Sequence, residues 1–267
     1  MNKESRLQEA YLSRLEKQRR KIMAARILLA LAFFLLWETA ADRGWIDSFF
    51  FSSPSRLGRL FLSMWRDGSL FLHVGITLTE TLVSFALVVV IGLAVSLLLW
   101  LSDSVFQVLE PYLVILNSLP KSALAPLLIV WLGANSRTII VAGMSVAIFG
   151  TILNLYTGFT ETSREKIRLI YTLHGTKKDA LTKVVLPSTV PMIISIMKVN
   201  IGLCLVGVVI GEFIGARNGL GDLIIYGSQV FQLDLVILSI LILCLMAMLL
   251  YGGVTAAEKL YHRRQHA

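Results

Sequence analysis

Long apolar stretches restrict this chain to very few folds. A hydrocarbon core of about 30 Å is crossed by roughly 20 residues of α-helix, and only helices and closed barrels satisfy their backbone polar groups inside it. With 56% hydrophobic and 16% charged residues, the chain is far more apolar than a soluble domain. We therefore expect an all-α membrane protein with six transmembrane helices, at about residues 26–46, 74–101, 105–132, 138–159, 188–216 and 235–257.

Basic residues gather on one side of a six-span bundle. They lie in an N-terminal arm (1–25), in the loop after the fourth span (160–187) and in a C-terminal tail (258–267). The positive-inside rule places these segments, and both termini, in the cytosol of a cell with a plasma (inner) membrane. Topology therefore explains most of the net charge of +8, and no nucleic-acid partner is expected.

The segment 47–73 is expected outside the cell membrane, ahead of a core domain at 74–257. Within it Ser53 can cap a helix, and Pro54 suits the first helical position. The helix would lie on the outer surface with one apolar face, formed by Leu57, Leu60, Phe61, Met64 and Trp65.

The sequence lacks the usual signs of an active site. No glycine-rich phosphate loop ending in Gly-Lys-Ser/Thr occurs, and the four histidines do not have metal-ligand spacing. Cys204 and Cys244 both lie in apolar segments, where they are expected to act as small hydrophobic residues. We therefore expect no catalytic residue, no metal and no cofactor bound by this chain.

The cytosolic loop 160–187 predicts two short helices joined by an elbow. Ser163 is a good N-cap for the first helix, and Gly175 supplies a left-handed stop. One face of that helix would carry Ile167, Ile170, Tyr171 and His174.

The second helix of the loop restarts immediately after the glycine. Thr176 is its N-cap, with Asp179 three residues later, and Lys177 and Lys178 lie between them. Pro187 then interrupts the helix at the membrane. The loop should therefore project from the bilayer as a charged elbow that can fit into a partner's groove.

Several motifs together resemble one transporter family. The segment from Gly175 to Val184-Val185-Leu186-Pro187 resembles the glycine-to-Ile-x-Leu-Pro half of the cytosolic motif in permease subunits of binding-protein-dependent ABC importers. Residues 109–133, LEPYLVILNSLPKSALAPLLIVWLG, and 211–224, GEFIGARNGLGDLI, are similar to patterns of the nitrate/sulfonate/taurine-type group. The resemblance extends over about residues 54–257. It departs from the family at residues 169–171, where Leu-Ile-Tyr replaces Glu-Ala-Ala, and near Glu80, where a basic residue is common.

The resemblance implies the architecture of a type I importer. Two permease subunits, here expected to be a homodimer, would work with two cytosolic ATPases and an extracytoplasmic solute-binding protein. ATP and Mg would bind to the partner ATPase, so this chain is expected not to be an enzyme. The loop around Gly175 would be the coupling helix. Its ATPase-coupling residues would be Ile167, Ile170, Tyr171, His174, Gly175, Thr176, Lys177, Lys178 and Asp179.

Polar residues inside the spans are candidates for the translocation path or its gate, because a charge in the bilayer needs a partner or an aqueous cavity. They are Glu80, Asn117, Lys121 and Glu212. Pro120 joins them because a proline near the middle of the third span would bend the helix, which suits a gate. Asn117 lies one turn before Lys121, so both can face the same space. Lys121 either lines the path or pairs with a carboxylate such as Glu80. Glu212 either bonds the loop at 219–221 or contacts solute, and Lys198 is expected to anchor a neighbouring helix.

A glycine stripe gives two alternatives for the fifth span. Gly207, Gly211, Gly215 and Gly219 recur every four residues and permit close helix approach. They either pack within one subunit or lie near a dimer axis.

The solute is the least constrained feature of the sequence. Lys121 favours an anion, such as a nitrate, sulfonate or taurine-like molecule, and the same machinery also imports thiamine-related pyrimidines and other small organic solutes. An ion-coupled secondary transporter would show an inverted repeat, and none is evident. A membrane scaffold or enzyme would give no reason for the glycine elbow.

Overall fold

The computed structural model describes the backbone of residues 3–265 and the side chains of residues 17–259. The described residues form helices without strands, in two compact units divided between Ser63 and Met64. The helices are α1 (Lys3–Asp42), α2 (Ser48–Phe51), α3 (Pro54–Arg66), α4 (Ser69–Leu101), α5 (Asp103–Ser118), α6 (Lys121–Leu132), α7 (Ser136–Thr160), α8 (Arg164–Thr172), α9 (Lys177–Ala180), a π-helix (Leu181–Val185), α10 (Leu186–Gly215), α11 (Leu220–Gln229) and α12 (Leu233–Gln265).

In the first unit, hydrogen bonds tie α1 to the chain that follows it. The Trp37 indole donates to the carbonyl of Phe51 at 3.2 Å, and the Ser55 amide donates to Glu38 at 2.9 Å. The predicted start of the outer helix is confirmed, because α3 begins at Pro54 and the Ser53 hydroxyl accepts from an amide in the first turn.

Five helices of the described chain are long and apolar enough to cross a membrane, and the expected third span differs from them. In place of one helix over 105–132, α5 and α6 meet at a bend of 95°. Leu119 is extended (φ −61°, ψ 136°), as expected for a residue before proline. The bend expected at Pro120 is therefore present, and it divides the third span into two helices.

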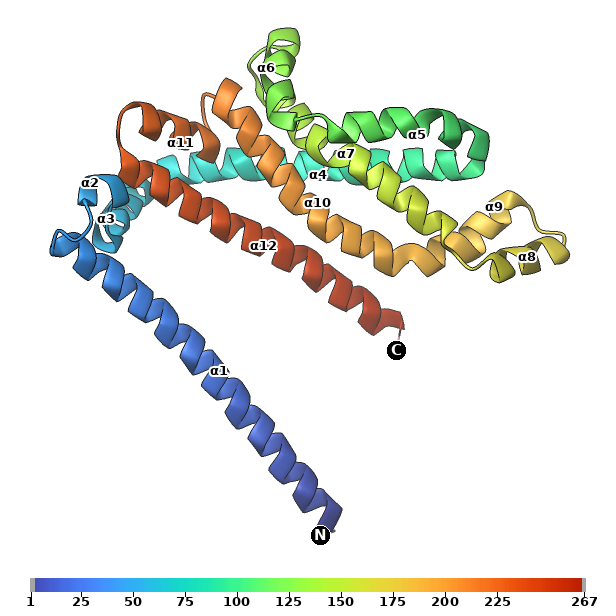
Figure 1. The fold of residues 1–267 in the computed structure, drawn as a ribbon, viewed down its shortest axis with the longest axis horizontal. Coiled ribbons are helices and arrows are strands. Elements are labelled where there is room, and N and C mark those ends of the chain that lie inside the picture. The colour runs from blue at the N-terminus through green and yellow to red at the C-terminus, as the bar shows by residue number, and fades with distance from the viewer. Residues whose placement is uncertain (1–2, 266–267) are drawn as a thin grey trace. The chain divides into compact units, whose positions relative to one another are not determined.

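The core of the second unit is built on α7, which packs along α4 and α10 (Figure 1). Small residues permit the close approach of α7 and α10. A Cβ atom on Gly207 would lie 2.8 Å from the Gly143 Cα atom, and one on Gly211 would lie 3.3 Å from the Ala142 side chain. A Cβ atom on Gly215 would lie 2.6 Å from the Ile129 side chain of α6, so three residues of the glycine stripe pack within the subunit. Gly219 is not part of the stripe's helix, since α10 ends at Gly215.

Serine side chains join α4 to α7. Ser84 donates to the Ile140 carbonyl at 3.0 Å, and Ser96 donates to the Ile152 carbonyl at 3.2 Å. Such interhelical bonds suit a bilayer, where apolar contact alone gives little preference between lipid and protein.

Candidate functional site

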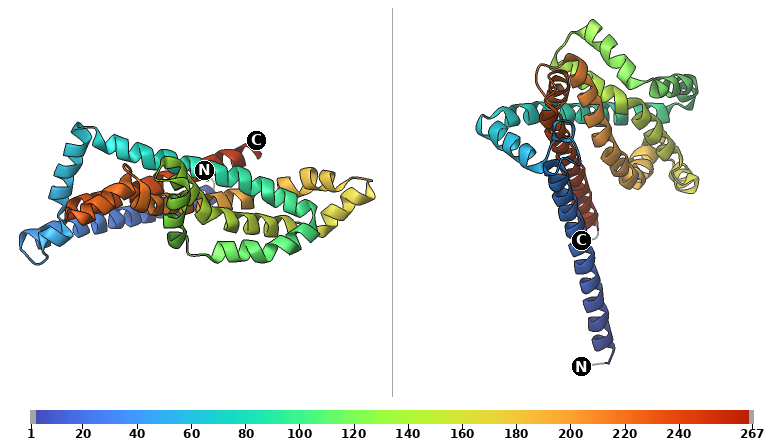
Figure 2. Two further views of the ribbon diagram at one scale, coloured as in Figure 1. Left: turned by 90° about the horizontal axis from the view of Figure 1, so that it is seen from above. Right: turned by 60° about the vertical axis from the view of Figure 1, so that its left-hand side comes forward.

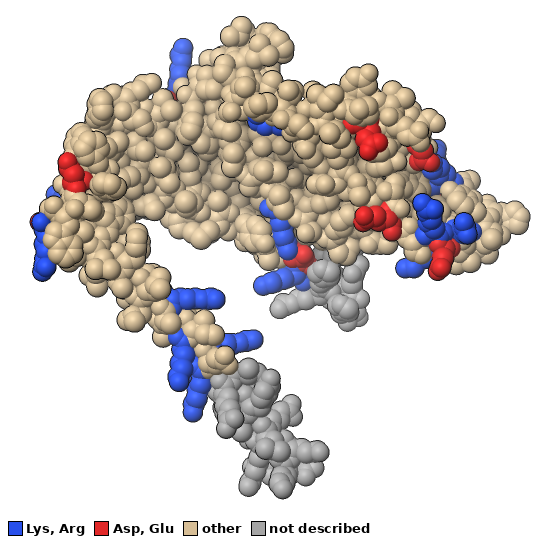
Figure 3. Space-filling view, in the orientation of Figure 1, with Lys and Arg blue, Asp and Glu red and all other residues tan. Residues whose placement is uncertain are grey.

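The elbow between α8 and α9 extends past the other helices at one end of the second unit (Figure 2). Lysine, arginine and acidic side chains gather there, whereas the flank of the same unit is largely uncharged (Figure 3). Charge that is confined to a projecting end fits a segment in water next to a membrane-embedded bundle.

The turn that ends α8 corrects the predicted role of Gly175. The left-handed residue is His174, with φ 60°, and Gly175 does not have positive φ. The His174 amide donates to Tyr171, and the Gly175 amide donates to Ile170 at 2.9 Å, which forms a Schellman motif. A Cβ atom on Gly175 would lie 2.9 Å from the Ile170 carbonyl oxygen. Glycine is therefore required for close approach and not for its dihedral angles.

The start of α9 matches the prediction. The Thr176 hydroxyl accepts from the Asp179 amide at 3.2 Å, while the Asp179 carboxylate accepts from the Thr176 amide at 2.9 Å. This is a complete capping box. Ser163 also occupies the N-cap position of α8, but its side chain makes no capping hydrogen bond.

The predicted interruption at Pro187 is wrong. The chain remains helical from Lys177 to Gly215, and the adjustment is a π-helix before the proline, Leu181–Val185. The Leu186 amide bonds the carbonyl of Leu181, five residues earlier. Because proline has no amide hydrogen, it sits in the first turn of α10 without losing a donor.

The exposed face of α8 also differs from the prediction. Ile167 and Ile170 are partly buried against the core cluster that contains Phe159 and Val185. Leu169 and Leu173 point outward instead, with exposed fractions of 59% and 70%, and Tyr171 is exposed as well. Sequence reasoning missed the two leucines because the helix face was assigned without knowing which side the bundle covers.

Lys177 ties the elbow to the loop between α4 and α5. Its ammonium donates to the Leu101 carbonyl at 3.1 Å and lies 5.4 Å from the centre of the Trp100 ring. Asp103 is 4.0 Å away. Lys177 is therefore half-buried within the subunit, whereas Lys178 is exposed.

Glu212 lies in a buried cluster at the other end of the bundle. Its carboxylate accepts from Thr77 at 2.6 Å and from the Gly221 amide at 2.7 Å. Gly219 has φ 134°, and a Cβ atom there would collide with the carboxylate. The prediction that Glu212 bonds the loop at 219–221 is confirmed.

Glu80 lies beside the same cluster and is equally buried, yet its environment differs. Glu212 and Ser136 are close to it, but neither carboxylate oxygen has a hydrogen-bond partner of ordinary geometry. Glu80 also lines a cavity of about 270 Å³, together with Arg217 of the α10–α11 loop.

Lys121 does not pair with Glu80 in the structure. Its ammonium donates to the carbonyl of Leu116 and lies 5.3 Å from the centre of the Phe149 ring. Asn117, which was expected to face the same space as Lys121, lies before the bend and lines a cavity to which Lys121 does not contribute. Lys198 behaves as predicted, because it forms an ion pair with Glu258 of α12.

A polar groove lies between α5, α7 and α10, and Asn117 is the only one of its lining residues that the sequence suggested for the translocation path. It has a volume of about 340 Å³, and it contains no charged side chain. Its polar residues are Asn117, Thr151, Asn154, Ser195 and Asn200. The sequence signal was present, since three asparagines in apolar helices are unusual, but no periodicity connects them across helices.

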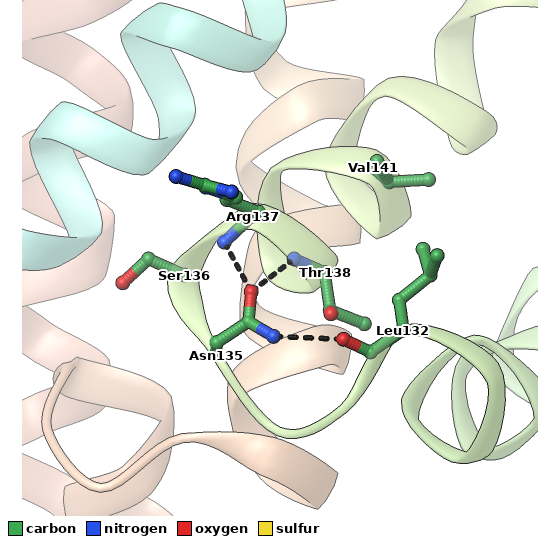
Figure 4. Close-up of a pocket in the computed structure, with 6 residues that line it drawn as sticks. All are labelled: Leu132, Asn135, Ser136, Arg137, Thr138 and Val141. Carbon is green, nitrogen blue, oxygen red and sulfur yellow. Dashed lines mark hydrogen bonds between the residues drawn. The ribbon is translucent and has the colours of Figure 1, made fainter.

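Another hollow lies at the turn between α6 and α7 (Figure 4). Asn135 occupies this turn. Its oxygen accepts from the amides of Arg137 and Thr138, at 3.0 and 3.2 Å, and its nitrogen donates to Leu132 at 2.9 Å (Figure 4). The carboxamide oxygen thus caps α7 while the nitrogen bonds the last residue of α6, so Asn135 holds the turn between the two helices.

A family of known proteins matches this helical unit. The family described as the inner membrane component of binding-protein-dependent transport systems matches residues 88–265, which include the groove and the elbow. The chain belongs to this family. It is therefore a multi-pass inner-membrane permease subunit of an ABC importer, and the resemblance noted from the sequence is confirmed.

Individual relatives of this chain are likewise named as transport permeases. A probable ABC transporter permease of Haemophilus influenzae is 29% identical over 89% of this chain and 95% of its own length. The formylaminopyrimidine transport permease ThiX of Halalkalibacterium halodurans is 28% identical over 73% of this chain and 77% of its own length. The taurine transport permease TauC of Escherichia coli is 24% identical over 84% of this chain and 83% of its own length.

The solved structures support the fold. An inward-facing structure of the MetNI methionine ABC transporter contains a chain with a TM-score of 0.60 and 20% identity, covering 69% of this chain and 92% of its own. At that identity the likeness shows the type I importer fold alone.

Proposed function

We propose that two copies of this permease assemble with two cytosolic ATPases and receive a small solute from an extracytoplasmic binding protein. The homodimer is supported by the groove, because polar side chains that are exposed in one copy need protein or water against them within a bilayer. Both termini and the α8–α9 elbow are assigned to the cytosol on the distribution of basic residues.

The observation that carries the proposal is the α8–α9 elbow. It presents the exposed Leu169 and Leu173 next to a turn that is fixed on both sides, by a Schellman motif at the end of α8 and by a capping box at the start of α9. Exposed leucines on a segment in water favour docking into an apolar groove of another protein. ATP-driven closure of the ATPases would then move this elbow and switch the bundle between inward-facing and outward-facing states.

The test replaces Leu173 with asparagine in the full importer. Leu173→Asn should leave membrane insertion intact but weaken ATPase binding and lower solute-stimulated ATP hydrolysis, since a docked leucine contributes about 1.5–3 kcal/mol. Arg164→Gln, an exposed change at the start of the same helix, is the control. Normal coupling in Leu173→Asn and in Leu169→Asn, measured in reconstituted vesicles, would show that the leucines do not dock.

The names of the relatives mention several different solutes, which are formylaminopyrimidine, taurine, aliphatic sulfonates, riboflavin and nitrate. In the sequence an anion was favoured by Lys121, but the ammonium of this residue bonds its own chain and does not line the groove. We therefore favour uncharged organic solutes, such as formylaminopyrimidine or riboflavin, over anions such as sulfonates or nitrate. The family match leaves the alternative of an ion-coupled transporter without support.

A further inference from the structure

The groove between α5, α7 and α10 places polar groups where lipid cannot satisfy them. The side chains of Asn117, Asn154 and Ser195 are exposed, and they lie on or beside helices that cross the membrane. Within the described residues, no hydrogen bond engages the carboxamides of Asn117 or Asn154. Unsatisfied amides at membrane depth are unfavourable against hydrocarbon, so this face meets water, solute or protein.

The groove has fixed polar walls. Asn200 is buried near the middle of α10, and its amide nitrogen donates to Thr151 at 2.8 Å. Thr151 in turn donates to the Ala147 carbonyl at 2.6 Å, so both side chains are held in place. A Cβ atom on Gly150 would lie 3.2 Å from the Asn117 oxygen, so glycine lets that carboxamide lie against α7.

The lining chemistry selects against charged ligands. A carboxamide both donates and accepts hydrogen bonds, so it pairs well with neutral amide, imide or aminopyrimidine edges. None of the lining residues is basic or acidic. An anion such as a sulfonate would lose its hydration without meeting a cation, and a cation would lose its own without meeting a carboxylate.

We propose that this groove is a solute-binding site on the translocation path and that it takes an uncharged polar molecule, such as an amide-bearing heterocycle. The assignment rests on the proposed importer function. The volume of about 340 Å³ holds a single small organic ring system. Asn154 and Asn117 hydrogen-bond the ligand directly, while Thr151 positions Asn200.

The test uses the complete permease–ATPase complex in lipid nanodiscs, without the binding protein. Equilibrium binding is measured for two neutral probes, formylaminopyrimidine and riboflavin, and for the organic anion ethanesulfonate. The variants are Asn154→Ala and Asn117→Ala, on different helices. Asn218→Ala, the same change in the α10–α11 loop outside the groove, is the matched control.

At least one neutral probe is expected to bind wild type, and about ten-fold more weakly to Asn154→Ala or Asn117→Ala, which corresponds to roughly 1.4 kcal/mol. Asn218→Ala should match wild type, and ethanesulfonate should not bind. Equal or tighter binding of ethanesulfonate, no binding of either neutral probe, or binding unaffected by both groove variants would overturn the assignment.

A failure of the groove assignment can be distinguished from a failure of the importer proposal. Co-purification of the ATPase and its dependence on Leu173 are measured in the same preparations. If the complex is intact and Leu173-dependent, but Asn117→Ala and Asn154→Ala do not change ligand binding, only the assignment of the groove as a solute site is refuted. A permease that never retains the ATPase refutes the importer assembly.

Discussion

At the scale of single residues, two buried glutamates show how strongly the surroundings decide a side chain's role. Glu212 and Glu80 are 2% and 3% exposed. The carboxylate of Glu212 accepts hydrogen bonds from Thr77 and Gly221, whereas that of Glu80 lies near Ser136 and Glu212 without a hydrogen bond of ordinary geometry. A buried acceptor without a partner costs free energy, and a satisfied one organises the groups around it.

The two glutamates are expected to respond in opposite directions to substitution. Glu212→Ala should lower the free energy of unfolding by about 1–3 kcal/mol, because the Gly221 amide and the Thr77 hydroxyl lose their acceptor. Glu80→Gln should leave stability unchanged or raise it, since it removes one of two acidic groups that are buried next to each other. Thermal unfolding in detergent micelles measures both, with the exposed Glu110→Gln as control. A loss of stability in Glu80→Gln would show that Glu80 has a stabilising partner in the assembled protein.

His174 and Gly175 provide the second prediction at this scale. Gly175→Ala should open the end of α8, because its Cβ atom would meet Ile170 at 2.5 Å, and ATPase coupling should fall. His174→Gly should keep coupling, and it should relieve a left-handed conformation that costs an L-residue about 1–2 kcal/mol. Hydrogen exchange of the α8 amides, together with solute-stimulated ATP hydrolysis, compares the two. Faster exchange in His174→Gly than in Gly175→Ala would contradict this view of the turn.

At the scale of elements, the pair α7 and α10 depends on glycine at particular positions. Gly143 and Gly207 face each other closely enough that no side chain fits between the helices. A Cβ atom added to Gly202, on the same helix as Gly207, would have no neighbouring atom within 4 Å. Both positions are glycine, so the difference between them comes from the neighbouring helix α7, which approaches Gly207 and not Gly202.

This difference predicts opposite effects of one substitution. Gly207→Ala should destabilise the protein by about 1–3 kcal/mol, since its Cβ atom would meet the Val146 side chain and also backbone atoms of Gly143 and Ala142, which cannot rotate away. Gly202→Ala should be neutral or stabilising by up to about 1 kcal/mol through helix propensity alone. The melting temperatures of both variants in the same detergent provide the comparison. Equal melting temperatures would mean that α7 and α10 are not so close in the membrane.

At the scale of the whole molecule, the bent pair α5–α6 decides the topology. Two membrane-spanning helices, α10 and α12, separate the elbow from the C-terminal end, so these two segments share one side whether or not α5–α6 crosses the membrane. The N-terminal arm shares that side only if α5–α6 crosses the membrane. A re-entrant pair would leave the arm on the opposite side, which the basic residues of the arm disfavour.

Cysteine labelling from one side of the membrane tests the crossing. In a background without Cys204 and Cys244, cysteines at Lys17 and Lys166 should both be protected from an impermeant reagent in whole cells and labelled in inverted vesicles. A cysteine at Arg66, after the first span, should give the reverse pattern. Labelling of the Lys17 position from outside, with Lys166 protected, would establish a re-entrant pair.

The sequence by itself determined the membrane class, most of the spans, the elbow with its capping box, and the family. These features are local, since they depend on hydrophobicity along one helix or on residues within one turn such as Thr176 and Asp179. Only the tertiary structure decided which side of α8 is buried, which glutamate is satisfied and which asparagines share a groove. Those outcomes depend on which helices become neighbours, and residues as distant as Asn117 and Asn200 carry no local pattern that records their meeting.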